Sequence, residues 1–141
     1  MSAKEYLKQL IVIDKLIDSK QKQVDRLRDL CSSQSPNYSG MPSGGGNRDR
    51  LGNLISNIVD LEREINDDID LLVNLKREVM SKIDLLDDNR HKLILNKRYL
   101  ENETFEKIAV DMDLSWKWTH KLHKEALEAF DKILKIFLKS S

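Results

Sequence analysis

The residues with the clearest chemical potential are three lysines near the C-terminal end of the chain. Lys117, Lys121 and Lys124 are spaced by four and three residues, so in a helix they project from one face, together with His120. From Ser115 to Lys124 the segment contains no carboxylate. A nucleic-acid duplex carries one negative charge per ~1.7 Å, and an acid-free cationic helix face is suited to bind its phosphates. The spacing therefore predicts a nucleic-acid-binding helix, and a merely solvated lysine face is the alternative.

The segment from Phe105 to Lys124 has the apolar pattern of two helices joined by a tight corner. Asp113 stands at the corner, where a positive φ is needed, and Asp tolerates this better than most residues. Ser115 is expected to cap the second helix, and Thr119 to bond to a carbonyl of its own helix. Trp118 is expected to pack on the flank of that helix. This pattern predicts a helix-turn-helix whose inward residues are Ile108, Ala109, Met112, Leu114, Thr119 and Leu122.

The stretch from Leu93 to Leu127, LILNKRYLENETFEKIAVDMDLSWKWTHKLHKEAL, resembles region 4 of sigma-70-type factors. The likeness rests on RY after a short apolar helix, the T-F-E-K-I-A entry, the L-S turn and the L-H-K-x-A-L exit. It is strongest to small phage and prophage proteins of Gram-positive bacteria, the RinA and ArpU type of late-gene transcriptional regulators. The resemblance implies that Arg98 lies close to the DNA backbone and that DNA is contacted by Thr104, Ser115, Trp116, Lys117, His120, Lys121 and Lys124.

Two long helices separated by a loop are predicted upstream of this segment. The first has an apolar seam in steps of four and three residues, and Ser32 to Asn47, rich in Gly, Pro and Ser, predicts a flexible loop. The second helix is predicted from near Arg48 to about Leu86. The predicted seams are Tyr6, Leu10, Ile13, Ile17, Val24, Leu27 and Cys31 in the first helix, and Leu51, Leu54, Ile58, Leu61, Ile65, Leu72, Leu75 and Val79 in the second.

The predicted fold is therefore all-α, with a coiled-coil helical hairpin over residues 1–86 and a helix-turn-helix DNA-binding domain over residues 87–141. The long second helix carries a further apolar stripe, formed by Ile55, Ile69, Val73, Met80 and Ile83. One short neighbour cannot cover both of its stripes, so self-association is expected, with a homodimer favoured over larger oligomers.

Charge and composition narrow the classes of function. The formal net charge is zero, but residues 31–88 contain 6 Lys and Arg against 11 Asp and Glu, whereas residues 89–141 contain 11 against 8. Contact with DNA is therefore expected only in the C-terminal domain. The single cysteine, Cys31, and the absence of a signal peptide or a long apolar run predict a cytoplasmic protein. The resemblance to phage and prophage proteins implies that its cell is a bacterial host.

No residue pattern predicts catalysis. The pairs Asp67-Asp68 and Asp87-Asp88 are sequence neighbours that diverge by ~100° around a helix, which favours a solvated surface over a metal site. His91 and His123 lack partners at metal-ligand spacing, so both are expected to be packing or surface residues. The chain is therefore predicted not to be an enzyme and to need neither cofactor nor metal.

The predicted function is that of a phage-type DNA-binding transcriptional regulator whose ligand is double-stranded DNA. RNA polymerase is a further candidate partner, because sigma region 4 also contacts the polymerase. Two alternatives stay open: a phage small terminase subunit, which also joins a helix-turn-helix to an oligomerising helical region, and a coiled-coil adaptor whose basic helix docks on an acidic protein.

Overall fold

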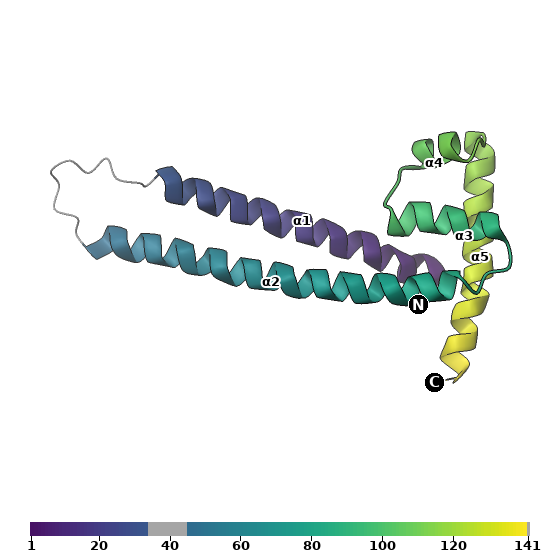
Figure 1. Ribbon diagram of the computed structural model, residues 1–141, viewed down its shortest axis with the longest axis horizontal. Helices are drawn as coiled ribbons and strands as arrows, with labels where there is room; N and C mark the ends of the chain where they lie inside the picture. The colour runs from purple at the N-terminus through teal and green to yellow at the C-terminus, as the bar shows by residue number, and fades with distance from the viewer. Residues whose placement is uncertain (34–44, 141) are drawn as a thin grey trace. The chain divides into compact units, whose positions relative to one another are not determined.

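The computed structural model describes residues 1–33 and 45–140, and this part of the chain is all-α, as predicted (Figure 1). Most of the predicted loop at residues 32–47 lies outside the described residues. The helices are α1 (Ala3–Ser33), α2 (Gly45–Ile83), α3 (Asn89–Leu95), the π-helical turn η1 (Asn96–Leu100), α4 (Phe105–Asp111) and α5 (Trp116–Ser140). Helix α2 thus begins three residues before Arg48 and ends three residues before Leu86.

The middle parts of α1 and α2 form one compact unit, residues Asp14–Leu71. Two cross-helix ion pairs set its register: Lys20 Nζ lies 2.6 Å from Asp68 Oδ2, and Arg28 pairs with Glu62. The later residue of α1, Arg28, pairs with the earlier residue of α2, Glu62. The two helical segments are therefore antiparallel. Val24 is fully buried in this unit, whereas Leu51, predicted in the seam, is exposed.

The second unit consists of residues Met1–Ile13 and Leu72–Ser141. Phe130 of α5 is fully buried, and its ring stacks on Tyr6 of α1 with centroids 6.0 Å apart. The Tyr6 hydroxyl accepts a hydrogen bond from Lys82 Nζ at 2.8 Å, which joins the first turns of α1 to the end of α2. Burial of apolar surface is the main stabilising term here. The fully buried apolar side chains of this core include Leu7, Val79, Ile83, Ile94, Leu95, Ile108 and Phe130.

A π-helical turn connects α3 to the segment that precedes α4. Asp88 caps α3 by accepting a hydrogen bond from the Arg90 N–H at 2.8 Å, and the chain then widens into η1. This turn buries Tyr99 and leaves the neighbouring Arg98 half-exposed. The chain reverses beyond it at Asn102, whose φ is 55°. Single π-turns of this kind often occur at functional sites.

The second apolar stripe predicted on α2 is largely exposed. Ile55 and Ile69 belong to the unit Asp14–Leu71, whereas Val73 and Met80 belong to the unit that contains α5. The side chains of all four residues are exposed. Ile83 does not belong to this stripe, because it is fully buried in the core that contains Phe130.

Candidate nucleic-acid interface

Helix α4 and helix α5 are joined by a tight turn whose geometry follows from two residues. Asp113 adopts a φ of 55°, as expected for the corner. The Asp113 N–H donates to Val110 O at 3.2 Å, and the Leu114 N–H donates to Ala109 O at 2.9 Å. Ser115 Oγ then accepts the Trp118 N–H at 3.2 Å, so the predicted cap of the second helix is present.

Thr119 lies at the centre of the contact between α4 and α5. Its side chain is fully buried, and its Oγ1 donates to the Ser115 carbonyl at 2.8 Å. A buried hydroxyl without a partner would cost about 1–3 kcal/mol, and this bond removes that cost. Ile108 and Leu122 are buried on either side of it. The prediction that these residues point inward is therefore confirmed for Ile108, Thr119 and Leu122.

The outer face of α5 is basic. Lys117, Lys121 and Lys124 are all exposed, and none of them is ion-paired within the described part of the chain. Lys121 Nζ lies 4.5 Å from the centroid of the Trp118 ring. Trp118 is 57% exposed, so the prediction that it packs on the flank of the helix was wrong. Lys121, one turn further on, contacts the ring, and more than half of the side chain faces solvent.

His120 lies between two aromatic rings and does not project outward with the lysines. Its ring centroid is 4.6 Å from that of Phe105 and 4.4 Å from that of Trp116. The Nε2 atom is buried and has no hydrogen-bond partner among the described residues. Helical spacing gives the direction of a side chain but not the neighbours that fold over it, and here Phe105 at the start of α4 covers the imidazole. Contact of His120 with DNA stays a prediction.

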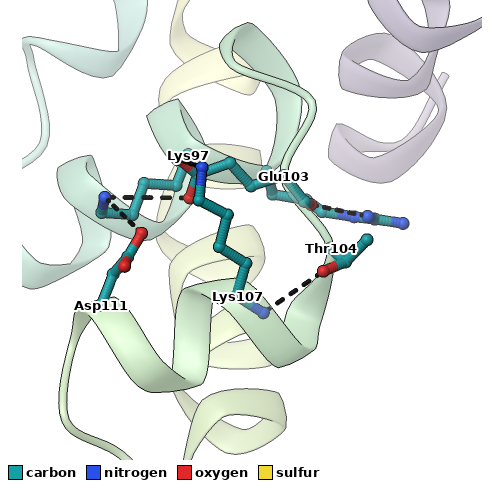
Figure 2. Close-up of polar contacts among 6 residues, drawn as sticks. Lys97, Glu103, Thr104, Lys107 and Asp111 are labelled. Carbon is teal, nitrogen blue, oxygen red and sulfur yellow. Dashed lines mark hydrogen bonds and ion pairs between the residues drawn. The ribbon is translucent and has the colours of Figure 1, made fainter.

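The segment before α4 is held by a cluster of ion pairs centred on Glu103, which sequence reasoning did not single out. Lys97 Nζ lies 3.5 Å from Asp111 Oδ2 and 3.8 Å from Glu103 Oε2, and Lys107 Nζ lies 3.4 Å from Glu103 Oε1 (Figure 2). The side chain of Glu103 is only 11% exposed, so these cations compensate a nearly buried charge. The sequence feature that could have indicated one of these ion pairs is the i, i+4 spacing of Glu103 and Lys107.

Two of the predicted DNA-contacting residues have structural roles here. Thr104 Oγ1 caps α4 by accepting the Lys107 N–H at 3.2 Å. Arg98 Nη1 donates to the Glu103 carbonyl at 2.9 Å, and its guanidinium lies 4.4 Å from the centroid of the Phe105 ring. Both side chains retain further donors that could bond to a phosphate. Their predicted role at DNA is not decided by these contacts.

Tyr99 and His123 form a buried polar pair beneath the start of α5. Tyr99 Oη and His123 Nε2 are 2.8 Å apart, and the two rings stack with centroids 5.7 Å apart. Burial raises the pKa of Tyr99 to about 12. Burial, followed by the charges of Arg98, Lys4 and His120, lowers the pKa of His123 to about 4. His123 is therefore a neutral packing residue at pH 7, which confirms one of the two roles expected for it.

A protein family described as "Protein of unknown function (DUF1492)" matches residues 31–131. The chain belongs to this family. In this DUF1492 protein the matched range contains α2, α3, η1, α4 and most of α5, and leaves out residues 1–30. No curated protein matches the chain, and no solved structure matches it.

Along residues 1–33 and 45–140, no helix has both the length and the apolar character that a membrane crossing requires. Within the same ranges, no three His, Cys, Asp or Glu side chains come together as a group that could hold a metal ion.

Proposed function

We propose that this DUF1492 protein is a DNA-binding transcriptional regulator of the phage type, in which α4, the turn and α5 act as a helix-turn-helix. The observation that carries the proposal is the exposed, carboxylate-free face of α5 at Lys117, Lys121 and Lys124. The capped turn at Asp113 and Ser115 fixes the direction in which this face leaves the core. The family description supplies no function, so the proposal depends on this geometry and on the resemblance to sigma region 4.

In this proposal α5 enters the major groove with its N-terminal turns. Lys117 and Lys121 reach base edges and phosphates, whereas Lys124, one turn further along, lies nearer the backbone. Trp116 is 54% exposed at the first position of α5, where an aromatic ring can contact a sugar or a thymine methyl group. The Ser115 and Thr104 hydroxyls, which already accept backbone N–H groups, keep their own protons free to donate to phosphates.

The hairpin of α1 and α2 is proposed to act as a coiled coil that pairs two copies of the chain. The exposed side chains of Ile55, Val59 and Ile69 on α2 support this, because a polar solvent-facing helix would not carry them. Two paired DNA-binding segments would place their half-sites one or more helical turns apart, ~34 Å per turn.

The same exposed stripe on α2 favours two other readings, a ring-forming small terminase subunit and an adaptor that docks on a protein such as RNA polymerase. The mass from light scattering distinguishes a terminase subunit from a regulator, since a packaging ring has many subunits and a regulator is expected to be a dimer. A pull-down of polymerase that survives nuclease treatment would favour the adaptor.

The decisive experiment is a triple charge reversal on α5, Lys117→Glu, Lys121→Glu and Lys124→Glu. A matched control reverses the exposed lysines Lys15, Lys132 and Lys139, which changes the net charge equally. Affinity for a labelled duplex of DNA flanking the gene is measured by fluorescence anisotropy at two or more salt concentrations. Each lost phosphate contact should reduce the salt slope by about 1, so a reduction of about 3 is expected for the α5 variant. Equal affinity and equal slope in both variants would refute the proposal.

A further inference from the structure

A basic hollow lies on the compact unit that contains α5, apart from the exposed lysines of the proposed DNA-binding face, although Arg98 and His120 of its wall are also among the residues predicted to contact DNA. Its volume is about 260 Å³. Residues from the first turns of α1, from η1 and from the two helices after it contribute to the wall. The lining residues are Lys4, Lys8, Ile11, Arg98, Tyr99, Phe105, His120 and His123.

Three cations of this wall, Lys4, Lys8 and Arg98, lack a counter-charge. None of the three forms an ion pair within the described residues, and the lining contains no carboxylate. Three other hollows of the described chain differ in this respect, since each contains at least one Asp or Glu. Like charges gathered in one concave site repel one another and raise the local concentration of anions. An anion is therefore the ligand class that this wall favours.

Arg98 is held in a fixed orientation at the hollow. Its guanidinium lies over the Phe105 ring, 4.4 Å from the centroid, and one N–H is used by the Glu103 carbonyl. Arginine has five N–H donors in a planar fork, so most of them remain available. A pre-oriented fork suits the oxygens of a phosphate, because several N–H bonds form without a further loss of side-chain entropy.

The positive field of the wall acts on the buried ring of His123. The pKa of His123 is lowered to about 4 by burial and then by the charges of Arg98, Lys4 and His120. The pKa of Tyr99 is raised to about 12 by burial, so both rings of this pair are uncharged at pH 7. The Nε2 atom of His120 is buried without a partner among the described residues, so one polar atom of the wall has an unused hydrogen-bonding position.

We propose that this hollow is a binding site for a phosphate group. Lys4 and Lys8, one turn apart on α1, and Arg98 on η1 supply the charge, and the Arg98 fork supplies the directed hydrogen bonds. A phosphate monoester carries about −1.5 to −2 charges at pH 7, which three cations can balance. The phosphate can come from a small phosphorylated molecule or from a nucleic-acid backbone. The proposal does not depend on DNA binding by α5, because the first source needs no DNA.

The test uses the intact chain and inorganic phosphate as the probe. The chain has three histidines, His91, His120 and His123, so their ring protons are resolved and assignable by NMR. The last two line the hollow, whereas His91 lines a different one and serves as an internal control. Sodium phosphate titrated against sodium chloride at equal ionic strength should shift the His120 and His123 signals saturably and leave His91 unchanged.

Two double variants complete the experiment. Lys4→Gln with Lys8→Gln removes two charges from the wall, and Lys15→Gln with Lys132→Gln removes two exposed charges elsewhere. Phosphate affinity should fall about tenfold or more in the first variant and stay within about twofold in the second. All four substitutions replace exposed side chains, so both proteins should fold. The proposal is overturned if phosphate shifts all three histidines alike, or if both variants retain the wild-type affinity.

A duplex titration then distinguishes the two sources of the phosphate. If a duplex perturbs His120 and His123 and competes with inorganic phosphate, the site takes a backbone phosphate. If duplex binding is unchanged in the Lys4 and Lys8 variant while phosphate binding is lost, the site takes a small phosphorylated ligand. Failure of the α5 charge-reversal test leaves the inorganic phosphate measurement unaffected, so the two proposals fail separately.

Discussion

The buried pair of Tyr99 and His123 predicts a stability that falls as the solution becomes acidic. In the folded chain the pKa of His123 is about 4, against 6.5 for an exposed histidine. Between these values the unfolded chain binds a proton that the folded chain does not, so the free energy of unfolding decreases as pH falls. At pH 7 both states are mostly unprotonated at this residue, so the penalty is small.

The size of this effect follows from the shift in pKa. One pKa unit corresponds to 1.36 kcal/mol, so a shift from 6.5 to about 4 removes about 3 kcal/mol of unfolding free energy between pH 7 and pH 4. His123 is 9% exposed, so solvent screening reduces this figure only modestly. Globular domains have ~5–15 kcal/mol in total, so the loss is measurable.

Urea unfolding followed by circular dichroism at several pH values between 7.5 and 4.5 measures the slope. Carboxylates titrate at the acidic end of this range, so the wild type is compared with His123→Gln, whose amide can still bond to the Tyr99 hydroxyl. The difference in slope between the two proteins isolates the histidine. Identical slopes in wild type and His123→Gln, or a His123 NMR titration midpoint near 6.5, would refute the reasoning.

Four further substitutions at three positions test the packing and the turns, each by urea unfolding at pH 7. Phe130→Ala should cost about 3–5 kcal/mol, because the ring is fully buried and its loss leaves a cavity. Asp113→Gly should be nearly neutral, since relief of the positive φ is offset by chain entropy, whereas Asp113→Val should cost about 1–2 kcal/mol. Thr104→Ala should cost about 1 kcal/mol through loss of the α4 cap. Equal stability of Asp113→Val and Asp113→Gly would contradict the assignment of strain at the turn.

The sequence predicted what depends on local rules. Asp113 at a positive φ, the Ser115 cap and the back-bonded Thr119 each follow from the preferences of one residue within one turn. The apolar periodicity likewise predicted the two long helices to within a few residues at the ends that the structure describes. These features need no knowledge of distant neighbours, which is why the pattern alone is sufficient.

What the sequence missed depends on residues far apart in the chain. In the sequence, Lys4 and Lys8 look like ordinary surface lysines of a heptad helix. They line a hollow with Arg98 only because the first turns of α1 pack in the same unit as η1 and α5. The π-helical η1 was not predicted either; it buries Tyr99, whose hydroxyl lies 2.8 Å from a ring nitrogen of His123, 24 residues later. Contacts between residues this far apart in the chain leave no recognisable pattern in a single sequence.

The hollow and the buried histidine are coupled, which leads to one last prediction. Arg98 and Lys4 are among the causes that lower the pKa of His123, and an anion bound between them would cancel part of their field. Bound phosphate should therefore raise the pKa of His123 from about 4 toward the 6.5 of an exposed histidine, although burial, the largest cause, persists. A higher folded pKa reduces the excess of protons on the unfolded chain, so the loss of stability between pH 6.5 and pH 4 should become shallower in phosphate than in chloride of equal ionic strength. NMR titration of the His123 ring in the two salts measures the change directly. An unchanged midpoint at saturating phosphate would show that the anion does not reach this wall.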